Sequence, residues 1–232
     1  MSVRVSLRLQ DGSTTDSPLS TMTSEMVLSG VPWRTIRSHR GQRHFPGLYW
    51  SSTTGGHVVY ESRLELARLL LADADREIVG IAAQPFLVCD KERRHVPDFL
   101  LARADGSVLI VNVKPVRRLD DPRVAAALAW AGRIFAARAW QHEIWSGADP
   151  YLLANLRFLA GYRRSAHLDP AAIVAGASLD LADLTIGEAE AVLASAGIAD
   201  PRPVLLHLVW AGALRVDLAC PLTCNTKLEV HP

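Results

Sequence analysis

The sequence is poor in cysteine, in lysine and in long apolar segments. Its three cysteines, Cys89, Cys220 and Cys224, cannot form an even set of disulfides, so we expect free thiols and a reducing, cytoplasmic location. No apolar segment approaches the roughly 18 residues of a membrane helix, and the first residues lack the charged-then-apolar pattern of an export signal. We therefore expect a globular protein of the cytoplasm without a membrane partner.

Lysine accounts for only three of the 25 basic residues, and one of the three is Lys114. In a chain that uses arginine almost everywhere, a lysine here indicates a site that needs a compact ammonium group, although chance is the alternative for one residue. Basic residues outnumber acidic ones by 22 to 16 through residue 164, whereas acidic residues predominate by 8 to 3 from residue 165 onward. We therefore expect the first part to approach a phosphate backbone and the second to be repelled by it.

The centre of the chain predicts a β-hairpin. Residues 95–101 and 108–113 are apolar segments separated by the turn signal Asp105-Gly106, and the second segment is apolar enough for a strand buried on both faces. Asn112 and Lys114 interrupt it with a period of two, so both project from one face, where an amide and an ammonium need polar partners.

The register of this hairpin decides whether its polar residues share a site. A two-residue turn would pair Asp98 with Val113 and place it on the wrong face, whereas a three-residue loop from Ala104 to Gly106 pairs Asp98 with Asn112. We therefore predict the longer loop, with Gly106 at positive φ. The Asp98 carboxylate should then lie about 4 to 6 Å from the Asn112 side chain, given metal–oxygen bonds of roughly 2.1 Å.

A helix is predicted from Ser62 through Leu71. Ser62 and Glu65 form a Ser-x-x-Glu capping box, so Glu65 has two possible roles: a helix cap or a carboxylate of an active site. Glu61 is a competing carboxylate beside it.

Four motifs occur in a fixed order. They are the Tyr60–Ala67 helix start with Ser62 and Glu65, then Gln84-Pro85-Phe86, then Pro97-Asp98-Phe99-Leu100, and finally Asn112-Val113-Lys114. Over residues 45 to 165 they resemble the PD-(D/E)xK nuclease domain of TnsA-like endonuclease subunits of heteromeric transposases. The resemblance implies an α/β restriction-endonuclease-like core, a mixed central sheet flanked by helices, that hydrolyses DNA at the 5′ ends of a transposon.

The resemblance also implies the residues of the site. Glu65, Asp98, Asn112 and Lys114 would be catalytic, and Mg²⁺, or Mn²⁺ in its place, would bind Glu65, Asp98, Asn112 and the backbone of Val113. Lys114 would orient or activate the attacking water. Asn112 stands where most nucleases of the superfamily carry an acidic residue, although the TnsA-like branch tolerates an amide here. Because the amide is uncharged, we expect the site to bind metal more weakly than an all-carboxylate site does.

Several residues are candidates for contacting DNA. Gln84 is expected to position water or phosphate, or else to be only a turn residue before proline. The other candidates are basic side chains that can pair with phosphates. Arg37, Arg40 and Arg43 belong to a basic, aromatic arm from Trp33 to His44, which could equally be a solvated loop. Arg93 and Arg94 precede the hairpin and could equally protect an exposed strand edge from pairing.

The remaining elements follow in chain order. We predict a short strand at 3–9 and a Ser- and Thr-rich mobile connection at 10–24. Further strands are expected at 78–83, 86–88 and 142–145, and helices at 122–139 and 151–160. The predicted domains are an amino-terminal strand and basic arm (1–44), the nuclease domain (45–165) and a carboxy-terminal domain (166–232).

The carboxy-terminal domain resembles a winged helix. Helices are predicted at 170–177, 186–196 and 202–211, followed by strands at 214–218 and 226–230. In the third helix, residues 204–210 offer no basic or amide side chain that could recognise base edges, so we interpret the domain as a protein-binding module. Cys220 and Cys224 with His207 or His231 could supply zinc ligands, but there is no second close pair, and free thiols are the better interpretation.

The resemblance implies three kinds of partner: DNA at the transposon ends, a TnsB-like DDE transposase that makes the other strand's cut, and a TnsC-like AAA+ ATPase. Two alternatives stay open. One is a stand-alone restriction or repair nuclease, and the other is a catalytically inactive structural subunit of a transposition complex.

Overall fold

The computed structural model describes residues 3–35 and 45–230 and divides the chain into two compact units, Met1–Gly147 and Ala148–Pro232. The division therefore falls before helix α4 (Pro150–Leu159), and not near residue 165 as the domain boundary was drawn from the sequence. The amide of Asn155 explains the difference, because its Nδ2 donates to the carbonyl oxygens of Leu218 (2.9 Å) and Cys220 (2.7 Å), within the second unit.

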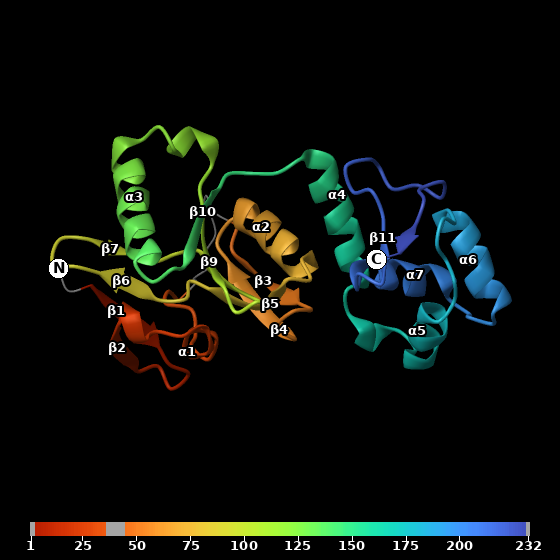
Figure 1. Cartoon of the computed structure of the whole chain (residues 1–232), viewed down its shortest axis with the longest axis horizontal. Helices are drawn as coiled ribbons and strands as arrows, with labels where there is room; N and C mark the ends of the chain where they lie inside the picture. The colour runs from red at the N-terminus through yellow and green to blue at the C-terminus, as the bar shows by residue number, and fades with distance from the viewer. Residues whose placement is uncertain (1–2, 36–44, 231–232) are drawn as a thin grey trace. The chain divides into compact units, whose positions relative to one another are not determined.

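A four-stranded mixed sheet forms the centre of the first unit, in the order β10-β9-β8-β5 (Figure 1). Strands β5 (Ile78–Ala83), β8 (Phe99–Arg103) and β9 (Val108–Val113) are antiparallel, and β10 (Gln141–Trp145) runs parallel to β9. A parallel pair needs a crossover, which α3 (Pro122–Ala136) supplies. The expected α/β class is confirmed, as are the strands at 78–83 and 142–145.

Helices cover both faces of this sheet. Ile110 belongs to one core cluster with Trp130 and Phe135 of α3, so α3 covers the face from which even-numbered residues of β9 project. Helix α2 (Arg63–Ala74) covers the other face. Nη2 of its Arg68 lies 2.7 Å from Oε2 of Glu143 on β10. Glu143 pairs with Val111, so it projects from the same face as the odd-numbered residues of β9. All six residues of β9 are consequently buried.

The predicted hairpin register is confirmed. Phe99 pairs with Val111 and Leu101 with Leu109, as a three-residue loop requires. The backbone N–H of Arg103 donates to the carbonyl oxygen of Ser107 over 3.0 Å, and Gly106 has φ 82°. Glycine takes this left-handed conformation without a steric penalty.

A second sheet has the order β2-β1-β6-β7. It consists of β1 (Arg4–Arg8), β2 (Thr14–Pro18), β6 (Leu87–Cys89) and β7 (Arg94–His95). The prediction of a structureless connection at 10–24 was wrong, because β2 pairs with β1 along its whole length and the Ser6 hydroxyl donates to Asp16 over 2.6 Å. Hydroxyl residues suit an exposed edge strand as well as they suit a loop.

Short helices complete the first unit. The 3₁₀ helix η1 (Leu19–Thr21) and helix α1 (Ser24–Leu28) follow β2, and η2 (Val116–Arg118) follows β9. Leu19, Met22 and Val27 are buried in the same core cluster as α3, so these apolar side chains fix the segment against the core.

The second unit contains the three predicted helices, α5 (Pro170–Ala177), α6 (Ile186–Ser195) and α7 (Pro201–Trp210). Two 3₁₀ turns, η3 (Ala160–Tyr162) and η4 (Ser165–His167), precede them. The strands after them, β11 (Leu214–Arg215) and β12 (Glu229–Val230), form the expected antiparallel pair but are shorter than predicted. All three cysteines are free thiols. His231, which was considered as a zinc ligand with Cys220 and Cys224, lies outside the described residues. Across the two described ranges, no helix is long and apolar enough to cross a membrane.

A second hairpin, β3 (Gly47–Ser51) and β4 (Gly56–Tyr60), was not predicted from the sequence. It is tied to the last turn of α2 by the buried carboxylate of Asp73. That carboxylate accepts hydrogen bonds from the hydroxyls of Tyr49 (2.7 Å) and Ser51 (2.6 Å), and from the backbone N–H of Ser52 (3.1 Å) and Thr53 (2.8 Å). Burial acts to raise the pKa of Asp73, but the hydrogen bonds outweigh it and hold the pKa below its ordinary value.

Asp73→Ala is expected to lower the free energy of unfolding by about 3 kcal/mol near pH 7, because several buried donors lose a charged acceptor. The folded pKa is depressed, so this contribution is fully present above the unfolded pKa of about 3.9 and is lost as the pH falls through the folded pKa. Urea unfolding at several pH values measures both effects. The exposed Asp120→Ala is the matched control; equal losses in the two variants would contradict the assigned role.

Candidate active site

Asp98 and Lys114 meet just beyond the paired ends of β8 and β9. Oδ2 of Asp98 accepts hydrogen bonds from the backbone N–H of Val113 (2.6 Å) and from Nζ of Lys114 (3.1 Å). Nζ of Lys114 also donates to the carbonyl oxygen of Val113 over 2.9 Å. The two side chains are 14% and 30% exposed, so the ion pair is shielded yet open to solvent on one side.

The end of β8 explains how the carboxylate reaches this position. The backbone N–H of Asp98 donates to the carbonyl of Val111 (3.1 Å), which is already the ladder partner of Phe99. As a result the side chain of Asp98, and not its backbone, accepts the N–H of Val113. Lys114 is held from the other side, since its own N–H donates to the carbonyl of Trp145 on β10 (2.9 Å).

Glu65 lies at the amino-terminal end of α2 and performs the capping role that was one of its two predicted roles. Ser62 Oγ accepts the N–H of Glu65 (3.1 Å), and the Glu65 carboxylate accepts from Ser62 Oγ (2.9 Å) and the N–H of Glu61 (2.8 Å). Burial raises the pKa of Glu65, and the negative charge of Asp98 raises it further against the lowering effect of these hydrogen bonds. The two carboxylates therefore lie close enough to repel each other, and a cation between them would relieve that repulsion.

Asn112 has different partners. Its fully buried Oδ1 accepts from Nε2 of His95 (3.1 Å) and from Nε2 of His142 (3.0 Å), so both imidazoles carry a proton on Nε2. Its Nδ2 is buried without a hydrogen-bond partner. The hairpin register is confirmed for Phe99 to Ala102, but the ladder ends before Asp98, so the pairing of Asp98 with Asn112 stays a prediction. The amide oxygen of Asn112 is shared by two imidazoles, and a metal bridge from Asp98 to Asn112 also stays a prediction.

The two histidines are held in their neutral forms. Burial lowers the pKa of His95, and the positive charges of Lys114 and Arg34 lower it further, against the opposing effects of Asn112 and Asp98. Burial also lowers the pKa of His142. Sequence analysis missed His142, although its position in the predicted strand next to 108–113 was a usable signal.

Gln84 joins the amino-terminal arm to the site. Its N–H donates to the carbonyl of Asp98 (2.8 Å), its own carbonyl accepts from the N–H of Trp33 (2.9 Å), and its Oε1 accepts from the N–H of Arg34 (3.1 Å). The residue is 4% exposed and has φ 47°, a left-handed conformation that is costly for a residue with a Cβ. These contacts fix the backbone around the site.

The predicted basic contacts are only partly described. Arg37, Arg40 and Arg43 lie outside the described residues, whereas Arg93 and Arg94 are exposed and line a cavity of about 450 Å³ together with acidic and basic neighbours. Within the part of the chain that the structure describes, no three His, Cys, Asp or Glu side chains form a group that could hold a metal ion.

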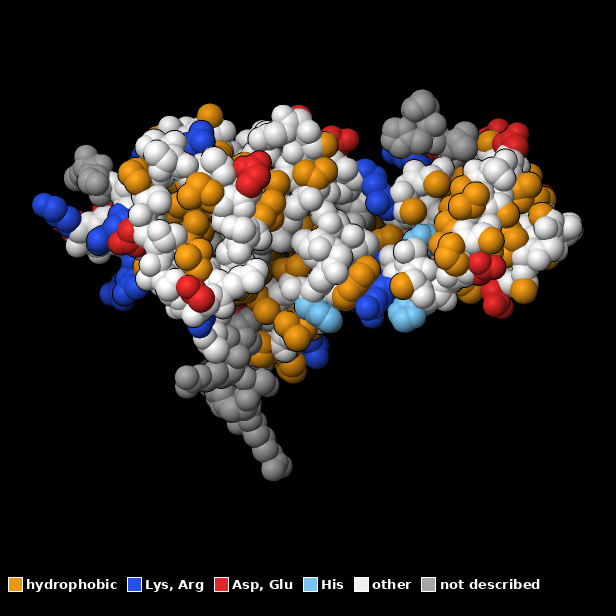
Figure 2. All heavy atoms as spheres, turned by 90° about the horizontal axis from the view of Figure 1, so that it is seen from below, with side chains coloured by type: hydrophobic (Ala, Val, Ile, Leu, Met, Phe, Trp, Pro, Cys, Tyr) orange, Lys and Arg blue, Asp and Glu red, His pale blue; other side chains and the backbone are white. Residues whose placement is uncertain are grey.

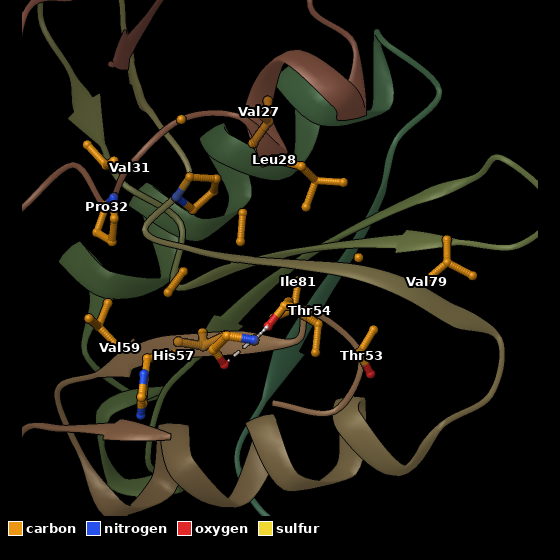
Figure 3. A pocket seen from close by; sticks show the side chains of 17 residues that line it. Val27, Leu28, Val31, Pro32, Thr53, Thr54, His57, Val59, Val79 and Ile81 are labelled. Atoms are coloured by element: carbon orange, nitrogen blue, oxygen red, sulfur yellow. Dashed lines mark hydrogen bonds between the residues drawn. The ribbon is translucent and has the colours of Figure 1, made fainter. Parts of the chain in front are cut away.

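A separate pocket of about 460 Å³ lies between α1, the β3–β4 hairpin and β5 (Figure 3). Its lining is largely apolar and includes Val27, Leu28 and Ile81, with His57, Thr53 and Thr54 as polar members. None of the described lining residues belongs to the Asp98–Lys114 group. The candidate active site is therefore an open corner at the end of the sheet and not this pocket.

Comparison of the chain with protein-family models and with curated proteins gives no match.

Gly132→Ala tests the packing of His142. A Cβ at Gly132, in the middle of α3, would lie 2.8 Å from Nδ1 of His142, whose ring also packs edge-on against Phe135. Alanine normally stabilises a helix relative to glycine. Here we expect a loss of about 1–3 kcal/mol, because the ring must move away from Asn112.

Thermal or urea unfolding measures the effect. Gly161→Ala is the control, since a Cβ there meets no atom within 4 Å. Stabilisation by Gly132→Ala would mean that His142 moves freely and that its hydrogen bond to Asn112 does not hold the ring.

Proposed function

We propose that this protein is the metal-dependent DNA endonuclease subunit of a heteromeric transposase, similar to TnsA-like subunits, and that it hydrolyses phosphodiester bonds at transposon 5′ ends. The observation that carries the proposal is the group formed by Asp98, Lys114 and the backbone of Val113, whose negative charge at Asp98 acts on the carboxylate of Glu65. An acid and an ammonium at one sheet end, with the half-buried carboxylate of a nearby helix end, suit phosphodiester hydrolysis better than they suit a structural ion pair.

The oxygen ligands near Asp98 suit a hard divalent cation. Asp98 and Glu65 have carboxylate oxygens and Val113 a carbonyl oxygen, and Mg²⁺ or Mn²⁺ prefers such ligands. The amide oxygen of Asn112 would join them only by giving up a hydrogen bond from His95 or His142. Burial raises the pKa of Glu65, the charge of Asp98 raises it further, and a cation held by the two carboxylates would lower it. A bound Mg²⁺ would offset charge on the phosphate and acidify the attacking water.

The protein's own groups would perform the remaining tasks. Lys114 is fixed between two oxygens at 2.9 and 3.1 Å, so its ammonium is already oriented and can position a water or offset charge on the phosphate. Asp98 is fixed by the N–H of Val113, which keeps its carboxylate in place while a ligand binds. The hydrogen bonds from Ser62 and Glu61 do the same for Glu65.

The architecture supports the restriction-endonuclease-like core in the proposal. That core is a mixed central sheet flanked by helices, and the first unit has three antiparallel strands, a crossover helix and a parallel fourth strand, with α2 and α3 on opposite faces.

We propose that the second unit is a winged-helix-like module that binds protein partners, a TnsB-like transposase or a TnsC-like ATPase. Helix α7 is its core element, with Leu205, Leu206 and Leu208 buried, so it cannot enter a DNA groove. On the face at the right of Figure 2, hydrophobic side chains cover much of this unit, and Val174 of α5 is 71% exposed. Apolar surface of this kind fits a protein partner.

Changing Asp98 to Ala or Lys114 to Ala should reduce Mg²⁺-dependent 5′-end cleavage more than about 100-fold, because each removes an oriented charge from the reacting phosphate. Cleavage is measured with the assembled transposase on transposon-end DNA, and circular dichroism checks that the variants fold. Wild-type cleavage that persists in Asp98→Ala would refute the site. A wild-type protein without cleavage, alone or assembled, would favour the inactive structural subunit.

Asn112→Asp should lower the Mg²⁺ concentration needed for half-maximal cleavage, because a carboxylate binds a hard cation more tightly than an amide does. Its geometry is conserved, since an acid oxygen can accept from His95 and His142 as the amide oxygen does. A Mg²⁺ titration of the cleavage rate provides the measurement, with wild type as reference. An unchanged requirement would show that residue 112 is not a ligand.

A further inference from the structure

The backbone at Arg34 is fixed against the candidate active site at several points. The N–H of Val31 donates to the carbonyl of Arg8 on β1 (2.9 Å), and Trp33 and Arg34 donate their N–H groups to the backbone and side chain of Gln84. Gln84 in turn donates its N–H to the carbonyl of Asp98. Arg34 therefore has a defined position two hydrogen bonds from a proposed catalytic residue.

Gln84 is under conformational strain while it makes these contacts. At φ 47° glycine would be easier to accommodate, but glycine has no Oε1 to accept the N–H of Arg34. Strained residues of this kind persist where the surrounding structure requires their side chain, and they concentrate at functional sites. The side chain of Gln84 thus has one evident purpose, which is to hold the arm at Arg34.

The guanidinium of Arg34 is held loosely by comparison. Its Nη1 lies 3.3 Å from Oε2 of Glu61, and the side chain is 50% exposed. This contact uses one of the five N–H donors of the guanidinium. A surface ion pair of this type contributes little to stability, so another anion can replace Glu61 at low cost.

Arg34 adjoins carboxylates that would repel a phosphate. The N–H of Glu61 donates to Glu65, so Arg34, Glu61 and Glu65 form a continuous path toward Asp98. The positive charge of Arg34 also reaches His95, beside Asn112. A phosphate that approached Lys114 would meet these carboxylates, and Arg34 offers a second cation with the planar fork that binds phosphate oxygens in pairs.

We propose that Arg34 is a phosphate-binding residue of the active site, which exchanges Glu61 for a phosphate of the DNA strand held at Asp98 and Lys114, with Gln84 as its positioning residue. The proposal rests on the proposed nuclease function and adds to it a residue that determines where the DNA backbone lies in the site.

The test measures binding of the full-length protein to a fluorescently labelled DNA duplex, by anisotropy, with Ca²⁺ in place of Mg²⁺ and over a range of salt concentrations. Arg34→Ala should weaken binding about 3- to 10-fold and reduce the slope of log K against log salt by about one, the signature of one lost phosphate contact. Arg34→Lys should keep the slope but bind more weakly than wild type, because the ammonium lacks the fork.

Two further variants separate the roles. Gln84→Gly should weaken binding in the same direction, and its effect should not add to that of Arg34→Ala in the double variant. Glu61→Gln should leave binding unchanged or tighten it, since it frees the guanidinium. Arg103→Ala is the matched control, because it removes the same charge as Arg34→Ala. Arg103 lies at the other end of β8, with its Nη1 3.0 Å from Oε1 of Gln141.

The outcomes distinguish the two proposals. If wild type binds and cleaves DNA while Arg34→Ala has the affinity and slope of Arg103→Ala, the role of Arg34 is refuted and the nuclease stands. If wild type neither binds nor cleaves DNA, alone or with its partner transposase, both proposals fail. A folded Arg34→Lys protein, checked by thermal melting, excludes misfolding as the cause of weak binding.

Discussion

The burial of β9 on both faces is the constraint on which the rest of the first unit depends. A strand with α3 on one side and α2 on the other cannot shift its register by one residue, since every side chain would then change faces. Its backbone pairs with β8 and β10, so the carbonyl and N–H groups at its end are held in place. Asp98 and Lys114 use those end groups of Val113, and their geometry follows from the position of the strand.

The capping role of Glu65 is compatible with its proposed active-site role. A cap needs the carboxylate at the amino-terminal end of α2, and that end lies close enough to Asp98 for the two charges to interact. The hydrogen bonds from Ser62 and Glu61 also restrict the rotamers of Glu65, which lowers the entropy lost when a ligand binds. Local helix chemistry thereby prepares the side chain for binding.

Sequence patterns predicted the features that depend on neighbouring residues. The helices at Ser62, Asp121 and Thr185 were found from their caps, and the loop at Gly106 from a parity argument that needed only one face of one hairpin. The features that were missed depend on residues far apart in the chain. Asp73 binds a hairpin about twenty residues earlier, and His142 meets Asn112 across a parallel pair. Neither periodicity nor turn signals encode such contacts, and the φ of Gln84 is set by its tertiary partners.

Helix α2 has a carboxylate with a fixed partner set at each end. Asp73 anchors the β3–β4 hairpin near the carboxy-terminal end, and the charge of Asp98 acts on Glu65 near the other end; along the helix axis the two residues of α2 lie about 12 Å apart. A molecule that displaced the hairpin would displace Asp73 with it, and the helix would carry that movement to Glu65 at the proposed cation site.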